Sequence, residues 1–216
     1  MAGHAVGYGG NVWAFLQWIL GFRRLGFDVY YVEEHQAKDL VDEDLKPAPF
    51  SKSANAQAFR RLIDRFELGD RAALLEAGTS AHVGLSREDI DKVAPDVDLF
   101  LNQFGAYIAV LGRVRRSVYL DLDPGHTQIW QEQYGVDMRV RGHDLYLTIG
   151  LNLGEPGCPF PTCGVRWEKT LWPIVLSEWA TDDSPGPSRR WPTGATTAGS
   201  SGKACGTRRR RRPSRP

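Results

Sequence analysis

The residues with the clearest capacity for chemistry follow an apolar run at positions 117–120. Asp121, Asp123 and His126 occur in the segment Asp-Leu-Asp-Pro-Gly-His. Side chains at i and i+2 share one side of an extended strand, so both carboxylates are predicted to face one cleft. They could bind a cation, accept a proton or hold sugar hydroxyls, and His126 could move a proton near neutral pH. An ordinary turn is the alternative, because Asp-Pro-Gly is common turn chemistry.

A second polar group follows the next apolar run. Residues 145–149 form that run, and Gly150 and Asn152 come directly after it. In parallel sheets ligands bind at the carboxyl ends of the strands. We therefore predict that Asp121, Gly150 and Asn152 bind a ligand, with Asp123 and His126 as the catalytic pair.

A glycine-rich loop near the start of the chain is a third candidate. Gly9, Gly10 and Asn11 precede an apolar-periodic stretch at 12–22, where Asn11 would cap the following helix. Backbone N–H groups at such a helix start can bind phosphate or carboxylate. A tight turn without a ligand is the structural alternative.

The same loop permits a dinucleotide-binding interpretation. Gly7 and Gly9 begin a G-x-G pattern, and Glu33 lies about where a ribose-binding acid would. However, Val12 occupies the position of the third glycine, so the pattern is incomplete.

Alternating helical and strand patterns surround these residues. The capping-box pair Ser86 and Asp89 indicates a helix start. Such alternation favours an α/β fold, a Rossmann-like mostly parallel sheet of five or six strands flanked by helices. The expected strands are 29–32, 72–75, 97–101, 117–120 and 145–149, and the expected helical stretches are 12–22, 58–66, 106–111 and 127–134.

The composition changes sharply after residue 179. Residues 180–216 contain nine Lys or Arg, two Asp and no Val, Ile, Leu, Met, Phe or Tyr. Such a segment cannot bury enough apolar surface to offset the entropy of ordering. We predict a Rossmann-like domain at 1–179 and a disordered tail rich in Arg, Gly, Pro and Ser at 180–216.

The start of the chain is short for this fold. Only residues 1–6 precede the glycine loop, which is too little for the buried strand that should lead into it. We expect that first strand to be encoded upstream of the assigned start.

Neither a metal site nor a membrane segment is expected. Cys158 and Cys163 form a C-x4-C pair without a second pair or a nearby histidine. The apolar stretch at 12–22 is too short to span a bilayer, and its basic residues follow it instead of preceding it. The expected location is cytoplasmic.

Several motifs together resemble the amino-terminal domain of GT-B-type glycosyltransferases. They are GGNVWAFLQWILGFRRLGFDVYYVE, DLDPGHTQIW, HDLYLTIGLNLG and the run W-x-x-T-x-x-P-I-V-L-x-x-W ending at Trp179. The resemblance implies an acceptor-side domain and a nucleotide sugar as donor substrate, with no cofactor. For this acceptor side our candidates are Gly9, Gly10 and Asn11 as the ligand loop, and Asp123 with His126 as base and orienter.

The sequence departs from that family after Trp179, where a linker and donor domain should follow. Arg outnumbers Lys 21 to 6, and the amino acids of the tail are largely those with G/C-rich codons. We interpret the tail as the product of a frameshift or truncation, which would leave this chain without transferase activity.

The tail also raises the possibility of nucleic-acid binding through Arg208 to Arg212, because clustered arginines attract phosphates. That run has no interleaved aromatic residues and no fold around it. No specific nucleic-acid partner is therefore expected.

Overall fold

A computed structural model describes residues 9–179 of the 216-residue chain. The predicted disordered tail at 180–216 lies outside the described residues. Four α-helices are present in the described part: α1 (Gly9–Arg24), α2 (Ala54–Arg65), α3 (Arg87–Val93) and α4 (His126–Glu132).

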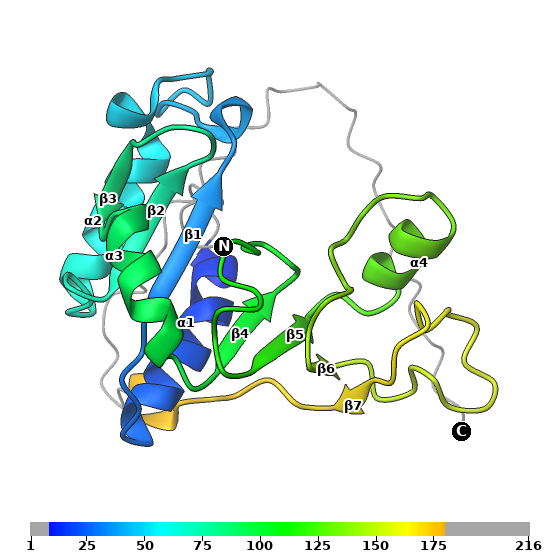
Figure 1. Ribbon diagram of the computed structural model, residues 1–216. Coiled ribbons are helices and arrows are strands. Elements are labelled where there is room, and N and C mark those ends of the chain that lie inside the picture. Colours follow the sequence, from blue (N-terminus) through cyan, green and yellow to red (C-terminus); the bar gives the residue numbers. More distant parts are fainter. Residues whose placement is uncertain (1–8, 180–216) are drawn as a thin grey trace, which may run out of the picture.

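The strands form two sheets, and the α/β prediction is confirmed (Figure 1). The first sheet has the order β1-β2-β3, with β1 and β2 parallel and β3 antiparallel to β2. The second has the order β4-β5-β6-β7 and is entirely parallel. The strands are β1 (Tyr31–His35), β2 (Ala72–Glu76), β3 (His82–Gly84), β4 (Phe100–Gln103), β5 (Ser117–Asp121), β6 (Leu145–Thr148) and β7 (Glu168–Lys169).

The expected strands exist, but their boundaries shift. The predicted run at 29–32 becomes β1 two residues later, and the run at 97–101 becomes β4 three residues later. The helical turn expected at 106–111 is wrong, because 106–108 are irregular and 109–111 form a non-helical turn. We predicted one sheet of five or six strands, whereas the described residues form seven strands in two sheets.

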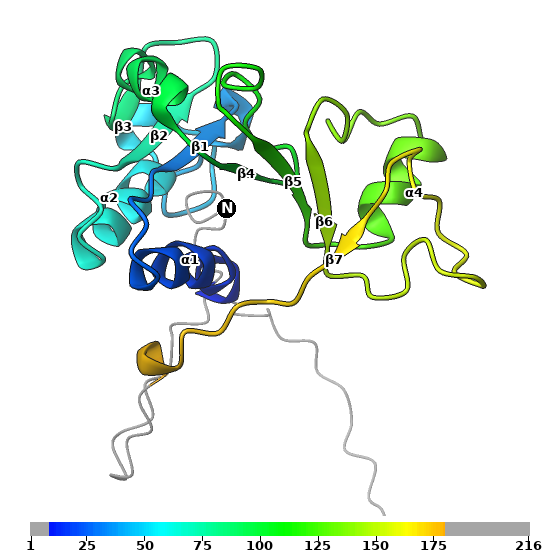
Figure 2. The same ribbon diagram turned by 60° about the horizontal axis from the view of Figure 1, so that its bottom comes forward.

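Helices cover both faces of the first sheet, as expected for a Rossmann-like unit. On one face α1 and α2 pack against β2 through Leu16, Ile19 and Phe59. On the other face Ile90 of α3 packs with Tyr107. Figure 2 shows α1 and α3 on opposite sides of this sheet.

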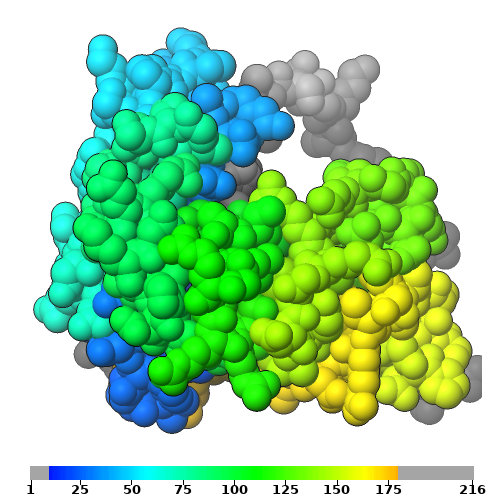
Figure 3. Space-filling view, in the orientation of Figure 1, coloured from blue at the N-terminus to red at the C-terminus, as the bar shows by residue number. Residues whose placement is uncertain are grey.

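The second sheet builds its own apolar cluster beside the first. Tyr119 of β5 is fully buried and packs with Val140, Leu153 and Trp167. In the space-filling view the two sheets and their helices form adjoining halves, blue to green and green to yellow (Figure 3).

The segment after β7 returns to α1 and links the two halves (Figures 1 and 2). The backbone N–H of Val175 donates to Oε1 of Gln17 at 2.5 Å, and Val175 is buried. The rings of Trp13 and Trp179 lie 5.3 Å apart. This C-terminal strap, defined as residues 171–179, therefore belongs to the folded body.

The described helices include none with the length and apolar character that crossing a bilayer requires.

Candidate functional site

The carboxyl ends of β5 and β6 lie side by side and carry the predicted polar residues. The register of the parallel pair places Asp121 opposite Thr148, the last residue of each strand. The turns that follow these strands hold Asp123 and Gly150, so the structure brings both predicted groups to one edge of the sheet.

Asp121 is the centre of a buried hydrogen-bond network. Its Oδ1 accepts from Oγ1 of Thr127 at 2.9 Å and from the backbone N–H of Asp123 at 3.1 Å. Its Oδ2 accepts from Nε2 of Gln128 at 2.9 Å and Oγ1 of Thr148 at 2.8 Å. The side chain has no exposed surface. In this structure the carboxylate fastens α4 and β6 to the end of β5 and has no surface open to a ligand.

Asp123 and His126 behave differently and remain accessible. Their side chains are 60% and 43% exposed, and Nδ1 of His126 lies 3.4 Å from Oδ2 of Asp123. Strand β5 ends at Asp121, so Asp123 lies in the following turn. The prediction that the two carboxylates share one face of a strand is therefore wrong. The structure does bring the two side chains of the pair together, and their catalytic role stays a prediction.

One aromatic side chain borders His126 and a second borders the turn at Gly125, and the sequence analysis did not identify either of them. The ring of Trp130 lies 4.6 Å from the ring of His126, between centroids, and Trp130 is exposed. Trp130 follows His126 by four residues on α4, a spacing that could have revealed the contact. Phe160 comes from an irregular loop, where no periodic signal exists.

The ring of Phe160 lies against the turn at Gly125. Gly125 has a φ of +94°, and a Cβ there would lie 3.2 Å from the Phe160 ring. The backbone N–H of Gly125 donates to Oε1 of Gln128 at 2.6 Å. The hydrogen bond to the buried Gln128 side chain thus holds the turn after β5, and the partly exposed Phe160 ring packs on it.

Gly150 supports the same turn by close packing. A Cβ at Gly150 would lie 2.6 Å from Cβ of Pro124, so only glycine lets the two turns approach this closely. Its N–H donates to Oγ1 of Thr148 at 3.0 Å. Asn152 is exposed in the turn that Gly150 begins. The geometry gives Gly150 a packing role and leaves Asn152 available for contact.

The predicted loop at Gly9 to Asn11 is wrong, because α1 begins at Gly9 and these residues form its first turn. Asn11 therefore does not cap the helix. Figure 1 shows α1 running opposite to β1, so this turn points towards the carboxyl ends of the strands. No hydrogen bond in the described part of the chain joins it to residues 121–126.

Glu33 does not match a ribose-binding acid. It is 1% exposed, its Oε2 lies 2.9 Å from Nε2 of His35, and the hydroxyl of Tyr31 donates to its Oε1. Burial by itself would raise the pKa of Glu33, but the hydrogen bond and charge of His35 hold it below its ordinary value. A buried, engaged carboxylate argues against the dinucleotide interpretation.

His143 is also a structural residue. Its Nδ1–H donates to the carbonyl of Val140 at 3.1 Å, and its Nε2 lies 3.0 Å from Nδ2 of Asn102. The Oδ1 of Asn102 accepts from the N–H of Tyr107, which leaves its NH₂ group facing His143. Burial lowers the pKa of His143.

The described residues contain no group of three or more His, Cys, Asp or Glu arranged to hold a metal ion. Cys158 and Cys163 are both free thiols. Burial raises the pKa of Cys163 to about 11, which keeps it protonated and unreactive.

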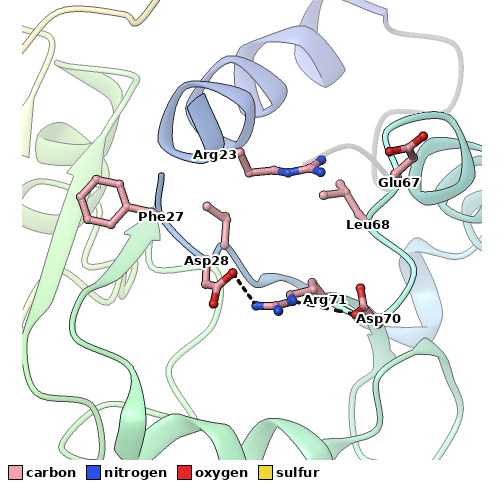
Figure 4. Close-up of a pocket in the computed structure, with 8 residues that line it drawn as sticks. Arg23, Phe27, Asp28, Glu67, Leu68, Asp70 and Arg71 are labelled. Carbon is pink, nitrogen blue, oxygen red and sulfur yellow. Dashed lines mark ion pairs between the residues drawn. The ribbon is translucent and has the colours of Figure 1, made fainter. Parts of the chain in front are cut away.

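A separate pocket lies at the amino ends of β1 and β2 (Figure 4). Nη1 of Arg71 lies 3.0 Å from Oδ1 of Asp28, and Arg23 and Glu67 also border the pocket. Ligands of doubly wound sheets bind at the opposite, carboxyl edge. Within the pocket Arg71 also pairs with Asp70, and Arg23 donates to the carbonyl of Phe66. The site at Asp123 and His126 is therefore the stronger candidate.

Comparison with known proteins gives no further guide: no family model matches the chain, and neither a curated protein nor a solved structure matches it.

Proposed function

We propose that residues 9–179 form the acceptor-side domain of a glycosyltransferase that uses a nucleotide-activated sugar. One observation supports this most: the exposed Asp123–His126 pair lies beside Trp130 at the carboxyl edge of a parallel sheet. A carboxylate–imidazole pair can deprotonate a hydroxyl, and an exposed indole ring offers an apolar face to a sugar ring.

The reaction divides among these groups as follows. Asp123 orients the imidazole through Nδ1 of His126, which leaves Nε2 to take the proton from the acceptor hydroxyl. The acceptor oxygen then attacks the anomeric carbon while the bond from that carbon to the diphosphate breaks. The diphosphate carries away the bonding electrons, and its charge needs stabilisation by groups on the donor side.

Acceptor binding is the direct test of this proposal. Saturation-transfer NMR of the 1–216 chain with a panel of mono- and oligosaccharides should detect at least one that binds. Trp130→Ala should weaken that binding about fivefold or more, because aromatic contacts contribute roughly 1 kcal/mol. Trp172→Ala is the matched control, since Trp172 is similarly exposed but lies in the C-terminal strap.

The catalytic test supplies a donor-binding domain as a separate chain, together with the acceptor found by NMR and a nucleotide-sugar donor. His126→Gln should then lower kcat about 10²- to 10⁴-fold while leaving acceptor affinity nearly unchanged. Absence of sugar binding by the 1–216 chain, or wild-type turnover in His126→Gln, would overturn the proposal.

A further inference from the structure

The C-terminal strap carries large apolar side chains that are open to solvent. Leu171, Ile174 and Leu176 are 71%, 66% and 77% exposed, and the two tryptophans of the strap, Trp172 and Trp179, are exposed as well. A single exposed apolar residue is ordinary, because no protein has enough polar surface to cover itself. A group of them within one short segment marks a surface that binds a partner.

The strap is fixed to the folded body by its other side. Val175 is buried, its N–H donates to Gln17, and its Cγ2 lies 3.7 Å from the position of a Cβ at Gly21. Its backbone is extended, with a φ of −89° and a ψ of 90°. Neighbouring side chains of an extended segment point to opposite sides, so Ile174 and Leu176 point away from α1. Their exposure therefore belongs to an anchored segment.

α1 lies between the first sheet and the strap (Figure 2). Leu16 and Ile19 pack into the core of that sheet, whereas Gln17 and Gly21 contact the strap from the opposite side of the helix. Arg24 follows Gly21 by three residues and shares its side of the helix, and it is exposed. The apolar side chains of the strap thus have a positive charge beside them.

The tail that follows the strap is strongly basic. Residues 180–216 hold nine Lys or Arg and two Asp, a net side-chain charge of +7, and Arg208 to Arg212 are consecutive. The strap itself has one charged residue, Glu178. Exposed apolar and tryptophan side chains enter the boundary between lipid headgroups and acyl chains, and a polybasic segment is attracted to anionic headgroups.

We propose that the C-terminal strap and the basic tail together bind the surface of an anionic lipid bilayer. Trp172, Ile174 and Leu176 enter the headgroup boundary, while Arg24 and the arginines of the tail contact the headgroup phosphates. Because α1 holds the strap, binding also orients the folded body on the bilayer. This inference does not depend on the proposed glycosyl transfer.

Three other occupants of the strap fit these observations less well. The tail of the same chain contains no Val, Ile, Leu, Met, Phe or Tyr, so it has little apolar surface to place over the strap. A second copy would meet the strap through a two-fold axis, which brings two tails of like charge together. A nucleic acid would attract the arginines but would leave the apolar side chains exposed to water.

Co-sedimentation with lipid vesicles tests the proposal on the 1–216 chain. Vesicles of equal parts phosphatidylcholine and phosphatidylglycerol should bind it at least about tenfold more tightly than vesicles of phosphatidylcholine alone. Replacement of Arg208 to Arg212 by glutamine should remove most of this preference, because each basic residue near an anionic surface adds to the attraction.

A pair of matched leucine variants tests the strap itself. Leu176→Ser should weaken binding to the anionic vesicles about tenfold, because it removes a side chain that becomes buried in the bilayer. Leu45→Ser is the control, since Leu45 is 67% exposed in the loop after β1, at the opposite end of the molecule from the strap (Figure 1). That variant should bind as the wild type does. Both variants should keep the wild-type Tm, because neither side chain is buried.

Four results would overturn the proposal. One is the absence of any preference for anionic vesicles. Another is anionic binding that Leu176→Ser leaves unchanged, which would show that the arginines act by charge alone. A dimer that Leu176→Ser dissociates, found by sedimentation equilibrium in place of vesicle binding, would assign the strap to a second copy. Binding to a DNA duplex without binding to vesicles would assign the tail to nucleic acid.

Discussion

Asp121 and Asp123 are two residues apart, yet one is structural and the other is available for chemistry. Asp121 ends β5 with no exposed surface and four hydrogen bonds to its carboxylate. Asp123 is 60% exposed beside His126. The difference arises because the chain leaves the sheet after Asp121, and the turn carries Asp123 towards solvent.

This contrast predicts unequal effects on stability. Asp121→Ala should lower the free energy of unfolding by about 3 kcal/mol, because it leaves several buried donors without an acceptor. Asp123→Ala should change it by less than about 0.5 kcal/mol, as expected at an exposed position. Urea denaturation followed by tryptophan fluorescence measures both, and similar losses in the two variants would contradict the assignment.

His143 predicts a pH dependence of stability. Its pKa is lowered in the folded protein from the ordinary value of 6.5, chiefly by burial. Below about pH 6.5 the His143 imidazole binds a proton in the unfolded chain but remains neutral in the folded protein. Stability should therefore fall as the pH drops from about 6.5. Above that pH this contribution should be fully present.

The measurement is the free energy of unfolding between pH 8 and pH 5, in wild type and in His143→Gln. Glutamine does not titrate, so the variant should lose part of the acid-side slope, even if it is less stable overall. Parallel pH curves for the two proteins would show that His143 does not contribute.

At the scale of elements, the hairpin between β2 and β3 depends on a glycine with a positive φ. Gly84 has a φ of +76°, and a Cβ there would lie 2.0 Å from the carbonyl oxygen of Ala72. No real side chain tolerates that separation from rigid backbone. Ala72 pairs with β1 at Tyr31, so a displacement there would reach the centre of the first sheet.

Gly84→Ala should therefore destabilise the protein by more than about 2 kcal/mol, through strain and displacement of Ala72. Gly78→Ala is the matched control, because Gly78 has a φ of +75° with nothing within 4 Å of the added Cβ. It should cost only the conformational penalty, about 1 kcal/mol. Thermal unfolding by circular dichroism compares them, and equal shifts in Tm would refute the steric argument.

At the scale of the whole molecule, the C-terminal strap joins the far end of the second sheet to α1. Val175 packs beside Gly21, with its Cγ2 3.7 Å from the position of a Cβ there. The hydrogen bond to Gln17 and the contact of Trp179 with Trp13 reinforce this closure. The folded body should therefore extend to residue 179 and depend on its last residues.

Truncation tests this boundary. A chain ending at residue 179 should retain the Tm of the 1–216 chain within about 2 °C, because the tail lacks the apolar residues needed for packing. A chain ending at residue 170 should lose several degrees, since it removes buried Val175. Limited proteolysis of the 1–216 chain should likewise stop near residue 181. A Tm that falls with removal of 180–216 alone would contradict this division.

The sequence by itself determined those features that depend on local pattern. Apolar runs located β2, β5 and β6 closely, and the Ser86–Asp89 capping box is present as predicted, because its two reciprocal hydrogen bonds lie within four residues. Alternation of these elements was enough to predict the α/β class. The proximity of Asp123 to His126 also followed from their spacing.

Only the tertiary structure decided how exposed each of these groups is and which of them meet. Glu33 and Asp121 are buried because neighbouring strands and helices cover them, and the partners of Asp121, Gln128 and Thr148, come from other elements. Phe160 reaches the site from an irregular loop, which has no period to read. Burial and long-range contact depend on how distant segments pack, and no local spacing encodes that.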